Sequence, residues 1–350
     1  MTTTLKTGLC SDQRFRNHVS PPDHPERPDR LVAIERRLDE RGLRTRCQPV
    51  AARLATQEEL ERVHDAAYLR SLEQRVGVPG ASGWLDPDTY YSPGSWTAAL
   101  LAAGAAVELA ERVHRGELDN ALGLVRPPGH HATRSRAMGF CLLNNVAVAA
   151  GALRARGARV AIVDFDVHHG NGTQDIFYDD PEVLYASTHQ YPFYPGTGDV
   201  DERGAGRGRG TTVNVPLPAG AGDAAYQRAF DDVIVPVIAR FGPDVLLVSA
   251  GFDAHRCDPL ASMNVTEAGY AALTRSLLGL AGGKLVALLE GGYDLDALAA
   301  SATALLAVLL GDPAPNPPGS ESSPSPSVFG AALSAAETAA IARAHKLHLG

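Results

Sequence analysis

The sequence is short of basic charge, of closely spaced cysteines and of long apolar runs, and each shortage excludes a class of protein. Its 40 acidic against 32 basic residues give a net charge of −8, which provides no general attraction to nucleic acid or to an anionic membrane. No run approaches the roughly 18 apolar residues of a membrane span, and residues 1–9 lack a signal-peptide core. We therefore expect a cytoplasmic protein with no nucleic-acid or membrane partner, in an oligomeric state that the sequence leaves open.

The four cysteines are too scattered to form a motif. Without any Cys-x-x-Cys spacing, neither a disulfide framework nor a structural zinc cluster is expected. Buried thiols in a reducing compartment fit this pattern better. The four are Cys10, Cys47, Cys141 and Cys257.

Between residues 120 and 295, short apolar runs alternate with amphipathic stretches, which is the pattern of strand and helix units around a parallel sheet. Apolar residues at three- and four-residue spacing predict the helices. The sequence therefore predicts an α/β protein with a central parallel sheet flanked by helices on both faces. The expected strands are 121–125, 160–163, 183–186, 245–249 and 285–289, and the expected helices are 28–41, 93–115, 145–156 and 226–241.

Residues 1–350 contain no internal repeat, and we expect a single domain. Residues 312–327 are dominated by proline and serine, which predicts a loop or linker. A final helix over 334–348 is expected to dock back onto the domain.

The segment 164–170, Asp-Phe-Asp-Val-His-His-Gly, sets metal-binding side chains at every second position directly after an apolar run. Alternate residues of a strand share a face, so Asp164, Asp166 and His168 should converge at one side of the strand end. Carboxylates and imidazoles bind hard or borderline divalent cations. A metal-dependent enzyme is the first hypothesis.

Four expected strands run directly into reactive residues. Ligands of open parallel sheets bind beyond the carboxyl ends of the strands, so the four clusters should meet in one crevice. The clusters are 126–131 (Arg-Pro-Pro-Gly-His-His), 164–170, 250–253 (Ala-Gly-Phe-Asp) and 290–293 (Glu-Gly-Gly-Tyr).

These clusters hold the groups that metal-assisted amide hydrolysis needs. Asp166, His168 and Asp253 supply three ligands and leave a position open for water, as a catalytic zinc requires. The metal lowers the pKa of that water, and His130 or His131 removes its proton and later delivers one to a leaving amine.

Three further polar side chains complete this set. Asp164 and Asn171 are placed to fix the tautomers of the two histidines. Tyr293, on a glycine-rich turn, is placed to donate a hydrogen bond to the oxyanion that forms when a carbonyl is attacked.

At these residues the chain resembles the histone deacetylase superfamily, which includes acetylpolyamine amidohydrolases and many bacterial deacetylases. The resemblance implies the arginase-like α/β fold, Zn²⁺ held by Asp166, His168 and Asp253, and Tyr293 as the group that polarises the substrate carbonyl. It covers most of the chain, in the blocks 24–31, 126–132, 139–145, 164–174, 195–198, 214–217, 249–255 and 289–293.

The same resemblance assigns roles to the histidine pair. It makes His131 the general base and acid, and gives His130, paired with Asp164, a mainly electrostatic role. Asn171 and Glu290 resemble the class II branch, because class I members usually carry Asp and Gly there. The partner of His131 is then an amide and not a carboxylate.

The acyl-lysine tunnel of the family maps onto Gly139, Phe140 and Tyr194, where two aromatic walls would grip the lysine methylenes. Arg30 matches the arginine of an internal channel behind the metal, where an acetate product is held.

The resemblance also bears on the substrate. Leu260 occupies the place where a polyamine-selective relative of the class II deacetylases carries Glu, and an apolar gate favours an acyl-lysine protein or peptide over a small acetylated amine. Gly94 stands near the position whose side chain anchors the substrate backbone, with Ser92 or Ser95 as candidate substitutes.

Structural K⁺ is a further cofactor that the resemblance implies. One family potassium site carries over to Asp164 and Ser187, with backbone oxygens of Asp166, His168 and Thr188. A second carries over to the neighbourhood of Phe177, Asp180 and Val183, although Thr211 replaces an aromatic residue that is common there.

Several alternatives stay open beside zinc-dependent lysine deacetylation. Fe²⁺ is an alternative to Zn²⁺, and acetylpolyamine hydrolysis is an alternative activity. The binuclear ureohydrolases share the architecture, but Gly170 and Gly251 stand where a second metal would need carboxylates. A non-catalytic acyl-lysine binder would lose proton-transfer or oxyanion groups, whereas His130, His131 and Tyr293 are all present.

Other features have plainer interpretations. His24 is as consistent with a local hydrogen bond as with the rim of the pocket. The Arg- and Gly-rich run 203–209 is expected to be a solvated loop. The histidines expected on the surface or on helices are His18, His64, His114, His345 and His348.

Overall fold

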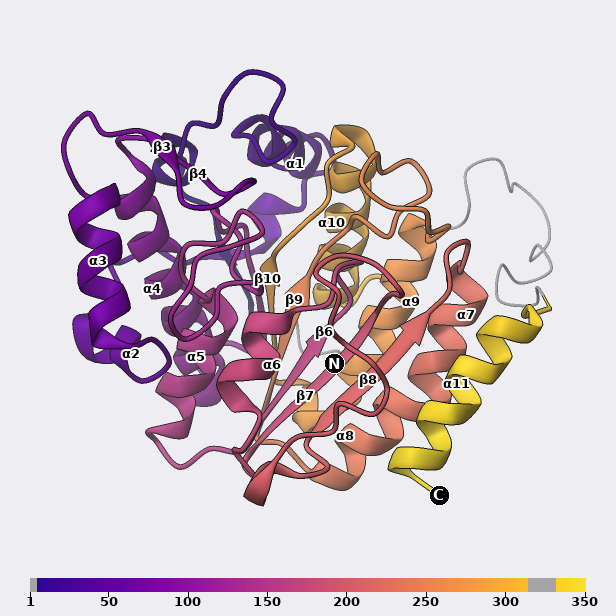
Figure 1. The fold of residues 1–350 in the computed structure, drawn as a ribbon. Coiled ribbons are helices and arrows are strands. Elements are labelled where there is room, and N and C mark those ends of the chain that lie inside the picture. The colour runs from indigo at the N-terminus through magenta and orange to yellow at the C-terminus, as the bar shows by residue number, and fades with distance from the viewer. Residues whose placement is uncertain (1–4, 314–331) are drawn as a thin grey trace.

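The computed structural model describes residues 5–313 and 332–350, and their framework is an eight-stranded sheet (Figure 1). The strand order is β2-β1-β5-β10-β9-β6-β7-β8, and all neighbouring strands are parallel. The strands are β1 (Thr7–Cys10), β2 (Gln48–Pro49), β5 (Asn120–Gly123), β6 (Val160–Asp164), β7 (Val183–Gln190), β8 (Thr212–Leu217), β9 (Val245–Ala250) and β10 (Leu285–Leu289); β3 (Gly83–Trp84) and β4 (Tyr90–Tyr91) form a separate antiparallel pair.

All five predicted strands are confirmed. Every residue of β5, β6, β7, β9 and β10 is buried, as expected for a parallel sheet covered on both faces. Sequence analysis missed β1, which is only four residues long, and β8, which contains Pro216. Proline is tolerated in β8 because that strand lies at the edge of the sheet.

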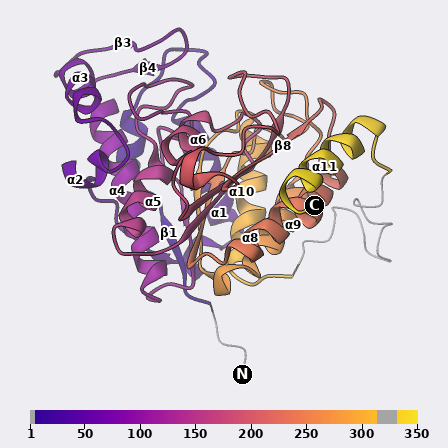
Figure 2. The same cartoon turned by 60° about the horizontal axis from the view of Figure 1, so that its bottom comes forward.

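Helices cover both faces of the sheet (Figures 1 and 2). The alanine-rich helices α4 and α5 pack together on one face, where small side chains allow a close approach, and α1, α10 and α9 lie on the other. The helices are α1 (Asp29–Glu40), α2 (Gln57–Glu61), α3 (Ala66–Val76), α4 (Ser95–His114), α5 (Asn145–Arg154), α6 (Asn171–Phe177), α7 (Asp223–Ala229), α8 (Val235–Phe241), α9 (Glu267–Leu278), α10 (Leu295–Leu309) and α11 (Ala335–His348). The short segments are η1 (Gln13–Asn17), η2 (Arg44–Arg46), η3 (Gly206–Gly208), η4 (Phe230–Ile234) and η5 (Ala281–Gly283).

The predicted helices are confirmed with small shifts. The predicted helix 226–241 begins earlier and is divided into α7, the π-helical η4 and α8. The predicted C-terminal helix is α11, which is capped by a reciprocal Ser334–Glu337 pair and packs against β8 and η4. Most of the predicted loop 312–327 lies outside the described residues, and the single domain stays a prediction.

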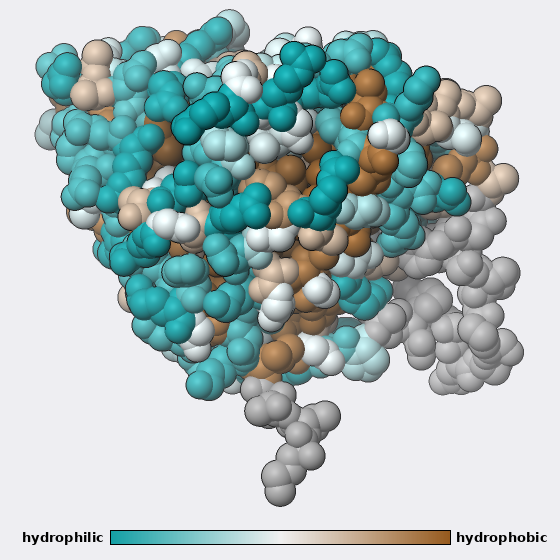
Figure 3. All heavy atoms as spheres, turned by 90° about the horizontal axis from the view of Figure 1, so that it is seen from below, coloured by the Kyte–Doolittle hydropathy of each residue, from teal (hydrophilic) through white to brown (hydrophobic). Residues whose placement is uncertain are grey.

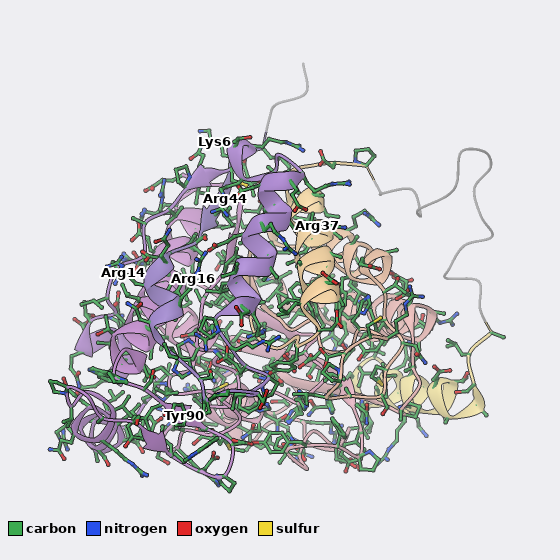
Figure 4. All side chains as sticks on the ribbon, turned by 90° about the horizontal axis from the view of Figure 1, so that it is seen from above. Lys6, Arg14, Arg16, Arg37, Arg44 and Tyr90 are labelled. Carbon is green, nitrogen blue, oxygen red and sulfur yellow. The ribbon has the colours of Figure 1, made fainter. Side chains whose placement is uncertain are left out.

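One face of the molecule is polar at its periphery and more hydrophobic toward its middle (Figure 3). Seen from below, hydrophilic residues cover most of the periphery and hydrophobic ones emerge near the middle (Figure 3). Figure 4 labels basic side chains on the side of α1 and η1. Arg14 pairs with Asp12 at 2.7 Å and Arg44 with Asp39 at 2.6 Å, and Arg16 pairs with Glu35. Over the described parts of the chain, every helix is too short or too polar to cross a membrane.

Two groups of sequence-based expectations need correction. Cys257 is exposed and Cys47 is half-buried, so only two of the four thiols are buried as expected. His18 and His64 lie in the interior and not on the surface. The ring of His64 is held by the Thr133 carbonyl at 2.9 Å and the Asn144 N–H at 3.0 Å, partners that lie far along the chain and leave no local pattern.

Burial lowers the pKa of His64 from its ordinary 6.5 to about 4. The unfolded chain therefore binds a proton on His64 between these values while the folded chain does not, and stability falls as the pH drops from 6.5 toward 4. We expect His64→Gln to remove about 2 kcal/mol of the stability loss between pH 7 and pH 5, measured by denaturant unfolding at both values. An unchanged slope in His64→Gln would contradict the lowered pKa of His64.

Candidate active site

The four reactive clusters meet at one edge of the sheet. In Figure 1 the strands run upward and the loops that follow them gather above the sheet. Strands β5, β10, β9 and β6 are consecutive neighbours in the sheet, and their parallel alignment brings the segments after them together. The structure thus assembles residues that are spread over more than 160 positions of the sequence.

Asp166, His168 and Asp253 form a compact set of donor atoms. One atom from each lies within 4.8 Å of the others. Nδ1 of His168 is 3.2 Å from Oδ1 of Asp166 and 3.1 Å from Oδ2 of Asp253. Backbone N–H groups orient the carboxylates, with Val167 donating to Asp253 at 2.9 Å and Gly291 to Asp166 at 2.8 Å.

This donor set fits a divalent cation. Asp164, Asp166 and Asp253 are all at most 1% exposed, and three carboxylates buried together require positive charge nearby. Two glycines keep the space around them clear, because a Cβ atom at Gly251 would collide with Asp166 and one at Gly291 with Asp253. Two carboxylates and one imidazole are a ligand set that both Zn²⁺ and Fe²⁺ accept.

His130 and His131 lie side by side with ring centroids 4.0 Å apart, but their partners differ. His130 Nδ1 lies 3.0 Å from Oδ2 of Asp164, and His131 Nδ1 lies 2.8 Å from Oδ1 of Asn171. Burial opposes charge on His130, but the carboxylates of Asp164 and Asp166 outweigh it and raise its pKa well above the ordinary value. Burial, with the neighbouring His130 and then His168, lowers the pKa of His131 well below it.

The surroundings of the two histidines thus favour different protonation states. Those of His130 favour a proton shared with Asp164, and those of His131 favour the neutral imidazole, which is able to accept one.

Two buried side chains support the histidine pair from behind. The Tyr185 hydroxyl donates to Asp164 at 3.2 Å and accepts the Gly170 N–H at 3.1 Å. Sequence analysis missed Tyr185, because a tyrosine within a buried strand has the pattern of an ordinary core residue. Glu290, noted only as a mark of the class II branch, accepts the N–H groups of residues 129 and 130 at 2.6 and 3.2 Å and the Ser249 hydroxyl at 3.1 Å.

Tyr293 lies at the side of this cluster, partly buried. The Arg30 guanidinium is 5.0 Å from the centre of its ring. Arg30 is fully buried, donates to the carbonyls of Gly292 at 2.7 Å and of Glu290 at 2.5 Å, and pairs with Glu26 at 3.2 Å. Arg30 thus contacts the backbone of the segment that carries Tyr293.

The predicted wall residues lie around the cluster. The Phe140 ring is 5.9 Å from that of Tyr293, and the Tyr194 ring is 5.2 Å from that of His131. Gly139 has a positive φ of 56°, and a Cβ atom there would collide with the His131 ring, so only glycine fits. Phe193, which sequence analysis did not single out, stacks on His168 at 5.4 Å.

The outer rim differs from the sequence-based expectation. Ser92 and Ser95, the candidate substitutes at Gly94, are both buried and bonded inside, Ser92 to the Val19 N–H at 2.9 Å and Ser95 to His18 at 2.6 Å.

Asp88, in the β3–β4 turn, instead lies against the predicted wall. Its side chain accepts the Gly139 N–H at 3.1 Å, and its carbonyl lies 3.3 Å from Nε2 of His24, whose ring is 4.9 Å from that of Phe140. The Asp-Pro-Asp-Thr turn sequence was the signal that could have drawn attention to it.

The remaining predicted residues lie close to the cluster or behind it. Leu260 is partly buried in the loop after β9. Ser187 pairs in register with Asp164 across β6 and β7, and Thr188 follows it with a buried hydroxyl that has no hydrogen-bond partner among the described residues. Phe177 ends α6 and Val183 begins β7, so the two flank one short connection.

Comparison with known proteins agrees with this architecture. Residues 24–309 match the histone deacetylase domain. The chain is 45% identical over 319 residues to histone deacetylase 15 of Arabidopsis thaliana (88% of this chain, 57% of the relative) and 41% identical over 348 residues to human histone deacetylase 7 (89% and 37%). It is 42% identical over 299 residues to a probable deacetylase of Archaeoglobus fulgidus (83% and 82%).

The fold also matches a solved structure, the crystal structure of the HDA15 HD domain. The TM-score is 0.91 at 42% identity, over 99% of this chain and 95% of that one. The fold and the cluster at the strand ends are those of an α/β domain with a central parallel sheet. The chain belongs to the histone deacetylase family. It spans about half the length, or less, of the plant and human relatives named above.

Glu290 is expected to stabilise the histidine loop through its two backbone contacts. Glu290→Ala leaves two buried N–H groups without an acceptor and should lower the free energy of unfolding by about 3 kcal/mol. Glu290→Gln keeps an oxygen toward these N–H groups and can donate to Ser249, so its loss should stay within about 1 kcal/mol. Denaturant unfolding followed by circular dichroism checks both, and equal losses in the two variants would contradict this account.

Proposed function

We propose that the protein is a zinc-dependent amidohydrolase of the class II deacetylase type, which removes acetyl or related acyl groups from lysine side chains. The observation that carries the proposal is the convergence of Asp166, His168 and Asp253 with the two histidines and Tyr293 at one edge of the sheet. Membership of the histone deacetylase family supports the reaction class.

Each residue has a proposed task. Asp166, His168 and Asp253 would hold the metal, which when bound supplies Lewis-acid chemistry to the carbonyl and to water. His131, neutral and oriented by Asn171, takes the proton of the attacking water and then delivers it to the leaving lysine amine.

Two further residues act on charge. His130, held against Asp164, keeps positive charge beside the buried carboxylates. The Tyr293 hydroxyl donates a hydrogen bond to the oxyanion of the tetrahedral intermediate. Arg30, behind it, is proposed to hold the acetate product.

The wall and the gate are proposed to choose the substrate. Gly139, Phe140 and Tyr194 would enclose the lysine methylenes. Leu260 offers no charge to attract a second ammonium group, which favours an acyl-lysine protein or peptide; acetylpolyamine is the alternative substrate. A cytoplasmic location stays a prediction.

Structural K⁺ is a second proposed cofactor. The buried carboxylate of Asp164 and Ser187, which pairs with it in register, support a cation on this side of β6 and β7, with backbone oxygens of Asp166, His168 and Thr188 as the further proposed ligands. Phe177 and Val183 flank the proposed second site. Fe²⁺ stays an alternative to Zn²⁺ at the first-described cluster.

Release of acetate from an acetyl-lysine peptide tests the activity and its metal. Chelation should abolish turnover of the wild type and added Zn²⁺ should restore it, with Fe²⁺ reloading as the comparison. Tyr293→Phe, which loses only the hydroxyl, should lower kcat by about 100-fold or more at unchanged zinc content. A folded, zinc-loaded wild type that releases no acetate would overturn acetyl-lysine hydrolysis in favour of acetylpolyamines, longer acyl groups or a binding role.

Leu260→Glu tests the gate. A carboxylate there should raise kcat/KM for acetylspermidine relative to the acetyl-lysine peptide by roughly fivefold, the size expected for a partly exposed ion pair. Leu260→Gln has the same shape without the charge and should leave the ratio near the wild-type value. A preference for acetylspermidine already in the wild type would favour the alternative activity.

A further inference from the structure

One carboxylate outside the proposed catalytic set joins two segments of the site. Asp258 lies in the loop after β9 and is only 7% exposed. Its Oδ1 accepts the Leu260 N–H at 3.0 Å. Its Oδ2 accepts the Tyr293 N–H at 2.6 Å and the Asp294 N–H at 3.4 Å. A single side chain thus holds both the proposed gate and the backbone of the proposed oxyanion donor.

The segment that carries Tyr293 needs such support. Gly291 and Gly292 precede it, and Gly292 has a φ of 116°, a conformation that few other residues adopt. Asp166 accepts the Gly291 N–H, one peptide group earlier. Arg30 donates to the Gly292 carbonyl and Asp258 accepts the Tyr293 N–H, so these two side chains hold the opposite ends of the peptide group that joins residues 292 and 293. Of the two, Asp258 bonds the N–H of Tyr293 itself, beside the Cα from which the phenol leaves the backbone.

We propose that Asp258 is a positioning residue that places the Tyr293 hydroxyl for the reaction. The inference rests on the proposed function, because it assumes that this hydroxyl stabilises an oxyanion. A preorganised donor acts only when its distance and direction match the oxyanion, and a displacement of about 1 Å lowers the rate by roughly 100-fold. The same carboxylate orders Leu260, so the gate and the phenol share one anchor.

The plainer alternative is that Asp258 only stabilises its own turn. The bond from Oδ1 to the N–H two residues on is an Asx-turn, which Asn makes as well as Asp. Asp258→Asn separates the two accounts. The amide oxygen can keep the turn at Leu260, but the NH₂ group then faces the Tyr293 N–H and cannot accept its hydrogen bond.

Asp223 provides a matched control. It is 5% exposed, and its carboxylate accepts the Thr266 N–H at 2.8 Å and the Thr266 hydroxyl at 2.6 Å, at the start of α9. Asp223→Asn therefore makes the same chemical change at a buried, backbone-bonded aspartate outside the proposed catalytic set.

The kinetic test uses the zinc-loaded enzyme with acetyl-lysine and trifluoroacetyl-lysine peptides. Asp258→Asn should lower kcat for the acetyl peptide by about 10- to 100-fold, with KM within about threefold. The loss should be smaller for the trifluoroacetyl peptide, because its electron-poor carbonyl depends less on a hydrogen-bond donor. Combined with Tyr293→Phe, Asp258→Asn should add little. Full additivity with Tyr293→Phe, or equal losses on both peptides, would overturn the proposal.

A measurement without turnover tests the positioning itself. In protein labelled with 3-fluorotyrosine, the ¹⁹F line of Tyr293 is identified by its absence from Tyr293→Phe. We expect this line to shift or broaden in Asp258→Asn and to stay in place in Asp223→Asn. An unchanged line in Asp258→Asn refutes the positioning role, whether or not the wild type is active. A wild type that is inactive on acetyl-lysine would refute the proposed function, but it would not by itself refute the positioning of Tyr293 by Asp258.

Discussion

The arrangement of the site depends on one electrostatic constraint, the burial of three carboxylates at the end of a parallel sheet. Asp164, Asp166 and Asp253 lie almost completely out of water. Carboxylates without partners in such a place lose their charge or destabilise the fold. Around them the chain supplies backbone N–H donors, a histidine that holds its proton and a tyrosine hydroxyl, and the donor geometry leaves room for a divalent cation.

Burial of the three carboxylates also requires glycine at neighbouring positions. Cβ atoms at Gly170, Gly251 and Gly291 would each collide with one of the three carboxylates. The sequence shows two of these glycines where a second metal would need carboxylates, and the structure adds that no side chain fits at either place. The glycines of the motifs Asp-x-His-His-Gly, Gly-Phe-Asp and Glu-Gly-Gly-Tyr therefore provide the space in which the carboxylates lie.

The parts of the fold and site that are readable from the sequence are those that local pattern encodes. The central strands are continuous apolar runs, and each leads into its reactive residues within a few positions, so both the sheet and the cluster at its edge could be predicted. The contacts of Tyr185 with Asp164 and of Asp258 with Tyr293 could not, because these partners are distant in the sequence. The turn sequence around Asp88 is visible, but its contact with Gly139 is not. The burial of His64 is of the same kind, since Thr133 and Asn144 reach it only in the folded chain.

The residues proposed for the reaction and those proposed to select the substrate lie in different parts of the fold. The groups proposed for the reaction sit at the ends of buried strands, where a shift of the backbone would disturb the whole sheet. The groups proposed to meet the substrate, such as Tyr194 and Leu260, sit on loops, and Asp88 contacts the Gly139 N–H of the predicted wall. Loops tolerate substitution far better than buried strands do. The reaction class can therefore be inferred from strand-end motifs, whereas the choice of substrate is proposed to depend on loop residues such as Tyr194 and Leu260.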